Sequence, residues 1–385
     1  MYIDNRIDFS NPEALALEKE RAESLFEGND GKLISYGADF TEMWQKLPGQ
    51  HNPFWTSADS FHAAMRIWRD LARRHRGGCY ACVCMNIIGL SYDVWDILRI
   101  GQDSDQAYHG EGCTFADGLV RQASGRYFYN GRVWWNNPDS FHVFCQGQYS
   151  YGQGKVHATF CALAGNRMMV SEPFSDQELP ADRLEIIKKV LPTTPDVSTA
   201  VDVFEHNPAR LWNLPVKRPF GEWNVVGLFN FNVPRSNEPL TQEIRFPDLG
   251  LSSEEDYLVY EFWSKSFLGA MRGGFTRTLE APDCEVYSIV PKPEHPVLIS
   301  TSRHVRQMAY DILTLEWNAG AGALTGRSRM VAGEPYELRI FVPEGYQMKR
   351  ASASGLPVAA GETGGILSVS FTATEHGTTD WEITF

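Results

Sequence analysis

The pattern of apolar residues changes near residue 200, and this change limits the folds open to the chain. Before it, short apolar, β-compatible runs alternate with amphipathic segments that have the spacing of helices. From Trp223 onward, the runs alternate every second residue and are separated by turns rich in Pro and Gly. We therefore predict an α/β domain over residues 1–200 and an all-β domain over residues 206–385.

The first domain is expected to contain about six strands separated by helices. The predicted helices span 12–26, 60–76, 152–163 and 182–191, and the predicted strands span 2–9, 33–39, 79–85, 97–101, 127–135 and 167–171. This order is typical of a parallel sheet, most simply part of a β/α barrel. The second domain is expected to be a β-sandwich, with runs at 224–230, 257–262, 284–290, 297–301, 312–317, 336–342 and 366–371.

The net charge and the hydropathy of the chain indicate which classes of binding partner are not expected. With 48 acidic and 35 basic residues, the net charge of −13 repels phosphate backbones, so we expect no nucleic-acid partner. No apolar run reaches the roughly 20 residues of a membrane span, and no membrane partner is expected. The first residues lack the basic and apolar regions of a signal peptide, and the localisation stays open between cytoplasmic and, for a truncated chain, secreted or periplasmic.

The chain contains no pattern that calls for a metal or an organic cofactor. Cys79, Cys82 and Cys84 form a C-x-x-C-x-C run, but no second Cys/His pair with ligand spacing lies nearby, so buried free thiols are expected. Asp103 and Asp105 are not followed by a calcium-loop pattern. His142 and His304 have no obvious partner and are assigned to the core or the surface.

Two acids at predicted strand ends suggest the chemistry. Asp39 closes the strand over 33–39, and Asp103 follows the strand over 97–101. The carboxyl ends of parallel strands share one rim, and a retaining glycosidase needs two carboxyls about 5–5.5 Å apart. We predict that Asp39 is the nucleophile and Asp103 the general acid/base, with Arg99 orienting Asp103 or holding a sugar hydroxyl.

Three further residues are candidates for substrate contacts. Trp135 and Asp139 flank an Asn-Asn-Pro stretch, which is either a sugar-binding loop or a structural Asx turn. Asp8 closes the first predicted strand, where it either contacts substrate or caps the helix that follows. A high aromatic content, 12% of residues, leaves rings for a sugar pocket after the core is filled.

An ordered set of segments resembles the alpha-galactosidase superfamily, glycoside hydrolase families 27 and 36 of clan D. Ser35-Tyr-Gly-Ala-Asp39-Phe resembles the family's Lys-x-Asp-Phe nucleophile strand, and Gly89-Leu90 with Arg99-Ile-Gly-Gln-Asp103 resembles its Gly-Leu…Arg-x-x-x-Asp acid/base segment. Trp135-Asn-Asn-Pro-Asp139 is similar to its Trp-Asn-Asp-Pro-Asp motif, and Asp8-Phe-Ser-Asn-Pro12 to the end of its third strand. The resemblance implies a β/α barrel followed by a C-terminal β-sandwich and a mechanism without a cofactor.

The chain departs from the family pattern at three points. Gly37 stands where the family has Lys, and Asn137 stands where it has Asp. The resemblance also places the first strand of this chain at the family's third, so that two of the eight strands that close such a barrel have no counterpart. We expect a missing N-terminal segment, a second chain or a homo-oligomer to complete the barrel. The alternative is that the chain has lost the activity.

The expected function is therefore retaining hydrolysis of terminal alpha-linked galactosides by double displacement, with an oligosaccharide or glycoside as substrate. Two alternatives stay open. A transglycosylase of the raffinose-synthase type would use the same carboxylates to pass the sugar to another sugar. A non-catalytic carbohydrate-binding protein would account for the departures at Gly37 and Asn137.

Overall fold

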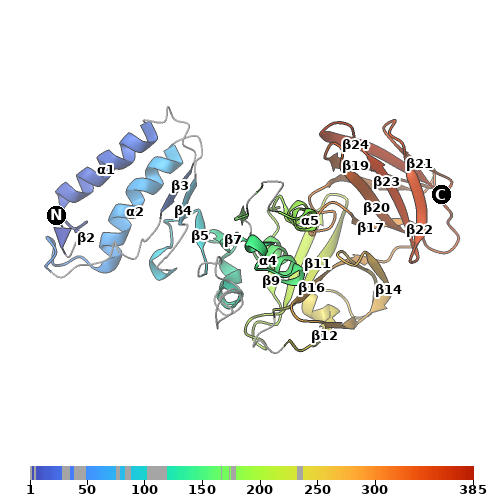
Figure 1. The fold of residues 1–385 in the computed structure, drawn as a ribbon, viewed down its shortest axis with the longest axis horizontal. Coiled ribbons are helices and arrows are strands. Elements are labelled where there is room, and N and C mark those ends of the chain that lie inside the picture. The colour runs from blue at the N-terminus through green and yellow to red at the C-terminus, as the bar shows by residue number, and fades with distance from the viewer. Residues whose placement is uncertain are drawn as a thin grey trace. The chain divides into compact units, whose positions relative to one another are not determined.

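The structure is a computed structural model of the 385-residue chain. It describes residues 2–3, 6–27, 35–38, 49–74, 79–82, 88–101, 119–165, 167–172, 174, 179–231 and 237–385. The backbone divides into two compact units, residues 1–104 with 128–139 and residues 105–127 with 140–385 (Figure 1). Each unit is described by itself.

The first unit contains a helix pair and a parallel sheet. Its sheet has the order β3 (Ser35–Ala38), β4 (Cys79–Cys82), β5 (Ile97–Arg99) and β6 (Trp135–Asn137). Helix α1 (Pro12–Glu27) packs against α2 (Ser57–Arg74), and a short 3-10 helix, η2 (Ile88–Leu90), precedes β5. Figure 1 shows the two helices in blue, side by side. The shared core contains Phe26, Phe61, Met65, Trp68, Leu71, Trp95, Leu98 and Trp134.

Helix α2 shows how the sequence specifies this packing. Its buried residues recur at helical spacing, and Trp68 donates a hydrogen bond from Nε1 to Oε1 of Glu18 on α1 at 2.8 Å. The helix begins earlier than the predicted residue 60, because Thr56 and Asp59 form a reciprocal cap. The Thr56 hydroxyl accepts from the Asp59 N–H at 3.3 Å, and the Asp59 carboxylate accepts from the Thr56 N–H at 2.7 Å.

Two strand predictions in this unit are wrong. Residues 2–9 form an antiparallel pair, β1 (Tyr2–Ile3) with β2 (Arg6–Ile7), and not a single strand. Residues 127–135 were expected to be a strand, but a 3-10 helix, η4 (Tyr127–Tyr129), lies there, and β6 begins at Trp135. The β-favouring aromatic residues of this stretch pack on one another, with the Tyr129 and Trp134 rings 4.7 Å apart. They therefore form an aromatic cluster and not a hydrogen-bonded β-strand.

The second unit begins with helices and one parallel strand pair. Helix α3 (Arg121–Arg126), which the sequence analysis missed, precedes the parallel pair β7 (Ser140–Phe141) and β8 (Met169–Val170). The 3-10 helix η5 (Cys145–Gly147), α4 (Tyr151–Ala164) and α5 (Ala181–Val190) complete this part. A capping box between Ser150 and Gln153 starts α4, and the Phe160 ring packs edge-on against Trp212 at 5.4 Å.

The remainder of the second unit consists of antiparallel sheets. A six-stranded sheet has the order β14 (Ser266–Arg272), β13 (Asp256–Glu261), β16 (Asp283–Pro291), β11 (Gly221–Asn230), β10 (Leu211–Arg218) and β9 (Thr199–Ala200). Strand β12 (Leu240–Arg245) pairs with β15 (Gly274–Leu279), and a 3-10 helix, η6 (Phe246–Leu249), follows β12.

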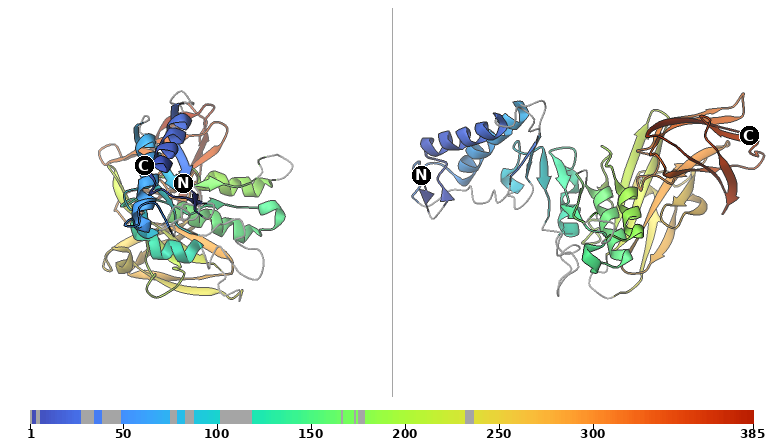
Figure 2. Two further views of the ribbon diagram at one scale, coloured as in Figure 1. Left: turned by 90° about the vertical axis from the view of Figure 1, so that its left-hand side faces the viewer. Right: turned by 45° about the horizontal axis from the view of Figure 1, so that its top comes forward.

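The C-terminal strands form two further four-stranded sheets. One has the order β17 (Val297–Thr301), β20 (Pro335–Phe341), β23 (Ile366–Thr372) and β22 (Ala359–Thr363). The other has the order β18 (Ile312–Asn318), β19 (Ala323–Met330), β24 (Gly377–Thr384) and β21 (Arg350–Ala353). They face each other (red in Figure 2), and Tyr336 on one donates to Ser328 on the other at 3.1 Å.

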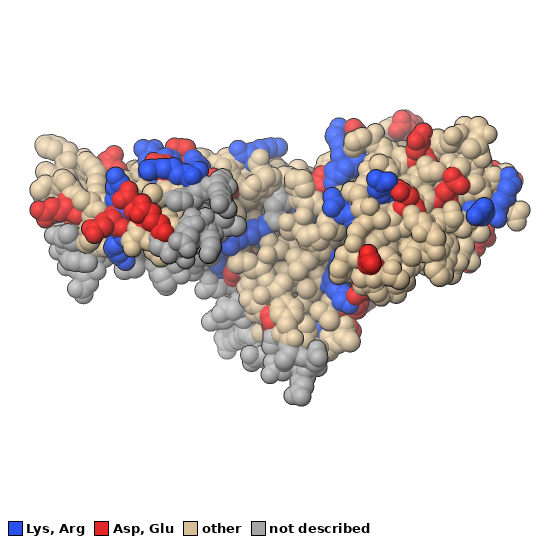
Figure 3. Space-filling model, turned by 90° about the horizontal axis from the view of Figure 1, so that it is seen from above, with Lys and Arg blue, Asp and Glu red and all other residues tan. Residues whose placement is uncertain are grey.

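The coarse fold prediction is confirmed: a mixed α/β part precedes mostly antiparallel sheets, including a β-sandwich. Among the described residues, the parallel strands form one four-stranded sheet and one pair, without a closed barrel. The domain division expected at residues 200–206 stays a prediction. No described helix is both long and apolar enough to cross a bilayer. On the face shown in Figure 3, the described Lys and Arg side chains are interspersed with Asp and Glu.

Candidate active site at the carboxyl end of the parallel sheet

The carboxyl ends of β3, β4, β5 and β6 meet at one edge of the sheet. The parallel register pairs Ala38 with Cys82, and Arg99 with Asn137. Asp39 is the residue after Ala38 in the sequence, and Asp103 follows Arg99 by four residues. Both acids lie outside the described residues, so their separation and their roles stay predictions.

A buried ion pair joins two of the other predicted residues at this edge. Nη2 of Arg99 lies 2.7 Å from Oδ2 of Asp139, and the exposed fractions of the two side chains are 3% and 13%. Arg99 is the last residue of β5, and Asp139 comes two residues after the end of β6. The chain therefore places a fixed, desolvated cation and anion at the sheet edge where the sequence predicts carboxylate chemistry.

The turn after β6 sets the position of Asp139. The Asn137 side chain accepts a hydrogen bond from the Asp139 N–H at 3.0 Å, and Asp139 has a φ of 72°, which Asp tolerates better than most residues. Asn137 is fully buried, and its Nδ2 has no acceptor among the described residues. The Asx turn considered for this stretch is thus present, and it directs Asp139 toward Arg99.

Trp135 and Asp139 belong to opposite ends of this segment. Trp135 is the first residue of β6 and is 37% exposed, so the segment is a strand followed by a turn and not a turn with flanking residues. No hydrogen bond or ring contact of Trp135 defines a sugar pocket among the described residues, and its proposed stacking role stays a prediction.

Asp8 makes the contacts of a cap. It follows β2, which pairs with β1 and is not part of the four-stranded sheet. Its carboxylate accepts from the Ser10 N–H at 3.0 Å, the Ser10 hydroxyl at 2.7 Å and the His51 N–H at 2.6 Å. Burial acts to raise the pKa of Asp8, but these hydrogen bonds outweigh it and hold the pKa below its ordinary value.

A second polar cluster, which the sequence analysis did not identify, follows β7 and β8. The carboxylate of Glu172 accepts from the N–H groups of Val143 at 2.6 Å, Phe144 at 2.7 Å and Cys145 at 3.0 Å. The rings of His142 and His157 lie 6.0 Å apart, and burial together with His142 keeps the pKa of His157 well below its ordinary value. Glu172 comes directly after the strand predicted over 167–171, the same signal that singled out Asp39, whereas no strand was predicted directly before His142.

The described residues contain no group of three His, Cys, Asp or Glu side chains placed to hold a metal ion. The cysteines that the structure describes with their side chains, Cys145, Cys161 and Cys284, are free thiols, and Cys284 is fully buried. Burial raises the pKa of Cys284 to about 12, so this thiol is unreactive at neutral pH.

Comparison with known proteins reveals similarity at the level of fold. No protein-family model matches the chain, and no curated protein sequence does. Alpha-galactosidase I from Mortierella vinacea superposes with a TM-score of 0.53 at 13% identity, covering 72% of each chain. A family GH27 β-L-arabinopyranosidase from Geobacillus stearothermophilus superposes with a TM-score of 0.54 at 12% identity. That match covers 75% of this chain and 64% of the arabinopyranosidase.

A variant of the same arabinopyranosidase, solved in complex with arabinose, matches with a TM-score of 0.54 and 12% identity over 74% of this chain and 64% of its own. The chain thus spans between about two thirds and three quarters of these enzymes. Over about 72% of its length, the chain has a fold similar to that of alpha-galactosidases and arabinopyranosidases of the GH27 type.

Proposed function

We propose that this protein is a retaining glycoside hydrolase of the alpha-galactosidase type. The observation that carries the proposal is the buried Arg99–Asp139 ion pair at the carboxyl ends of β5 and β6, in a fold similar to that of GH27 enzymes. Buried charged pairs are costly to maintain, and they concentrate at sites where chemistry needs fixed charge. In this proposal, residues 1–200 form a partial (β/α)8-type barrel, and residues 206–385 form the C-terminal domain.

The proposed mechanism uses the two acids that follow β3 and β5. Asp39 attacks the anomeric carbon while Asp103 protonates the leaving oxygen, which breaks the glycosidic bond and leaves a glycosyl ester on Asp39. Asp103 then removes a proton from water, which attacks the anomeric carbon and releases Asp39. The Arg99–Asp139 pair orients the acid/base segment or a sugar hydroxyl, and Trp135 offers an apolar face to the sugar. The hydrogen bonds of Asp8 favour a capping role over the substrate role.

The sugar class can be tested with two aryl glycosides. The structural neighbours are named for alpha-galactosides and for β-L-arabinopyranosides. The two sugars share the arrangement of their ring hydroxyls and differ by the hydroxymethyl group on C5. We expect nitrophenyl α-D-galactopyranoside to be hydrolysed with retention, as followed by NMR of the first-formed anomer, and the arabinopyranoside to be a poorer substrate.

The two carboxylate roles differ in their dependence on the leaving group. Asp39→Asn should abolish turnover of every aryl galactoside. Asp103→Asn should lose about 10²–10⁴-fold with a poor leaving group and much less with dinitrophenolate, which needs no proton. Asp93→Asn is the matched control, since Asp93 is an exposed carboxylate of the same unit, and it should keep wild-type turnover. Full turnover by Asp39→Asn would refute the nucleophile assignment.

A non-catalytic carbohydrate-binding protein is the second candidate. Asn137 stands at a position where the resembled family has a charged Asp. Its side chain is fully buried at the edge of the sheet, so a neutral group takes the place of a charged one there. Calorimetry that detects galactose binding without turnover of any aryl glycoside would favour this candidate. Transfer of the galactosyl unit to an added sugar, in preference to water, would favour the transglycosylase instead.

A further inference from the structure

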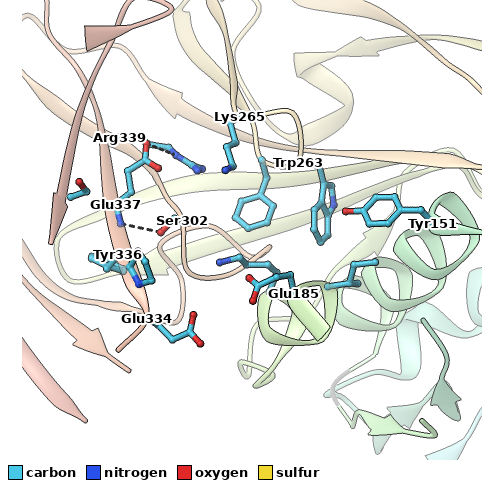
Figure 4. Close-up of a pocket in the computed structure, with 14 residues that line it drawn as sticks. Tyr151, Glu185, Trp263, Lys265, Ser302, Glu334, Tyr336, Glu337 and Arg339 are labelled. Carbon is cyan, nitrogen blue, oxygen red and sulfur yellow. Dashed lines mark hydrogen bonds and ion pairs between the residues drawn. The ribbon is translucent and has the colours of Figure 1, made fainter. Parts of the chain in front are cut away.

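A pocket of about 440 Å³ lies within the second unit, lined by α4 and α5, by the segment after β13, and by β20 and β23 of one C-terminal sheet (Figure 4). This volume falls in the range of small-molecule sites. None of its lining residues belongs to β3–β6. Its lining combines the aromatic residues Phe262 and Trp263 with the charged residues Lys189, Lys265, Glu334 and Glu337.

One wall of the pocket is aromatic. Phe262 and Trp263 follow directly after β13, and their rings meet edge-to-face at 5.3 Å with an interplanar angle of 82°. Phe262 is 4% exposed, so its buried ring fixes the orientation of the Trp263 indole beside it. Figure 4 shows Trp263 at the cavity, with Tyr151 of α4 beyond it. A rigid, flat apolar face of this kind accepts the C–H face of a sugar ring.

The carboxylates of the pocket already have cationic or hydroxyl partners. Nζ of Lys188 lies 2.9 Å from Oε1 of Glu185 and 2.6 Å from Oε1 of Glu334. Glu337 accepts from the Ser368 hydroxyl at 2.8 Å and lies 3.4 Å from Nε of Arg339. Each carboxylate still has lone pairs that can accept hydrogen bonds from hydroxyl groups.

Two ammonium groups of the pocket have no such partner. The structure gives neither Lys189 nor Lys265 an ion pair or a side-chain hydrogen bond among the described residues. Lys189 is half-buried, and burial lowers its pKa. The charges of Glu185 and Glu334 act to raise this pKa and those of Arg303 and Arg339 to lower it, and the net shift is downward. In Figure 4, Lys265 and Arg339 extend toward the same cavity. A half-buried ammonium without a direct ion pair is unfavourable, and a bound anion would relieve this cost.

From this arrangement we propose that the pocket is a second carbohydrate site, which binds a sugar unit carrying a carboxylate. The sugar stacks on Trp263, its carboxylate pairs with Lys189 and Lys265, and its hydroxyls contact Glu334, Glu337 and Ser302. The combination of partners excludes simpler ligands. Three carboxylates in the lining disfavour the double charge of a phosphate more than the single charge of a uronate, and a hydrocarbon acid would leave the hydroxyls and carboxylates of the lining without partners.

The test is binding of D-glucuronate and D-galacturonate to the full chain, measured by calorimetry and by saturation-transfer NMR, with D-glucose and D-galactose as neutral probes. We expect the uronates to bind and the neutral sugars to bind at least about tenfold more weakly, since a charge-assisted hydrogen bond is worth about 1.5–3 kcal/mol. Lys265→Ala and Lys189→Met should each weaken uronate binding by about tenfold. The exposed Lys292, outside the pocket, provides the matched control Lys292→Ala, which should bind like the wild type.

Trp263→Ala should remove the saturation transfer to the sugar C–H protons. If this variant does not fold, Lys265→Ala still tests the site, because Lys265 is exposed and its replacement should not disturb folding. Equal binding of neutral sugars and uronates would overturn the acidic specificity. No uronate binding, or uronate binding that survives both lysine substitutions, would overturn the site itself. Hydrolysis of aryl galactosides does not enter this test, so its outcome is independent of the proposed catalytic function.

Discussion

At the scale of single residues, the polar groups that matter most are buried and held by specific hydrogen bonds or ion pairs. Arg99, Asp139 and Asn137 are brought to one sheet edge by parallel pairing and an Asx turn. His304 is another such group, because its Nδ1 accepts a hydrogen bond from the Arg306 N–H at 3.0 Å inside the second unit. In both places, removing one partner leaves another buried group without its hydrogen bond.

The Arg99–Asp139 pair should show strong energetic coupling. We expect Arg99→Met and Asp139→Asn each to lower the free energy of unfolding by about 3 kcal/mol, and the double variant to lose much less than their sum. The exposed Arg73–Asp96 pair of the same unit, at 2.8 Å, is the control and should couple by less than about 1 kcal/mol. Urea denaturation of both cycles provides the measurement, and additive losses at Arg99 and Asp139 would contradict the prediction.

His304 should make the protein sensitive to mild acid. Burial and the charge of Arg306 lower its pKa to about 3 in the folded state, against about 6.5 in an unfolded chain. Between these pH values the unfolded chain binds a proton at His304 that the folded chain does not bind. The contribution of His304 to the free energy of unfolding is therefore fully present above pH 6.5 and is lost as the pH decreases toward 3. The stability gap between the wild type and His304→Asn should narrow by about 2 kcal/mol from pH 7.5 to pH 5, as measured by urea midpoints. A gap that does not change with pH would show that the prediction is wrong.

At the scale of elements, the helices of this chain are held by close backbone contacts as well as by side chains. A Cβ placed on Gly154 of α4 would lie 2.2 Å from the carbonyl oxygen of Val143, just after β7. The helix therefore lies directly on the segment whose N–H groups bind Glu172. A residue with any side chain at this position would displace backbone, which cannot move aside as a flexible side chain does.

Gly154→Ala should consequently be destabilising by about 3 kcal/mol or more, although Ala is the better helix former by about 1 kcal/mol. Gly125→Ala in α3 is the matched control, because a Cβ there meets nothing within 4 Å, and it should be neutral or slightly stabilising. Thermal unfolding monitored by circular dichroism compares the two variants. Equal stability of both would mean that α4 does not pack so closely.

At the scale of the second unit as a whole, Arg306 connects distant segments. Its fully buried guanidinium donates from Nε to the carbonyl of Ala162 at 2.7 Å and from Nη1 to the carbonyl of Thr194 at 2.8 Å. It also donates from Nη2 to the carbonyl of Gly165 at 3.2 Å. Burial lowers its pKa to about 10, which leaves it charged at neutral pH. This one side chain ties the end of α4 and the loop after α5 to the segment between β17 and β18.

Arg306→Met should lower the free energy of unfolding by more than about 3 kcal/mol, because several buried carbonyls lose their donor together. The exposed Arg350→Met should change it by less than about 0.5 kcal/mol. Differential scanning calorimetry should reveal a large fall of the melting temperature for Arg306→Met alone. An unchanged melting temperature would refute the connecting role.

Local patterns were sufficient to predict much of the secondary structure. The helices α1, α4 and α5 lie within one or two residues of their predicted ranges, and β17 matches its predicted range, because periodicity and caps are encoded within a few neighbouring residues. Strand β10 was missed because Pro215 interrupts its pattern, and the stretch over 127–135 failed because its aromatics pack on Tyr92 and one another.

The sequence alone determined the order of helices and strands, the change from α/β to antiparallel β structure, and the residues that stand at strand ends. The tertiary structure decided which of those residues meet. It joined Arg99 to Asp139, gave Asp8 the contacts of a cap, and surrounded Lys189 with a pocket formed by segments more than a hundred residues apart. Helix and strand formation depends on neighbours along the chain, whereas ion pairs and pockets depend on distances that only the folded backbone sets.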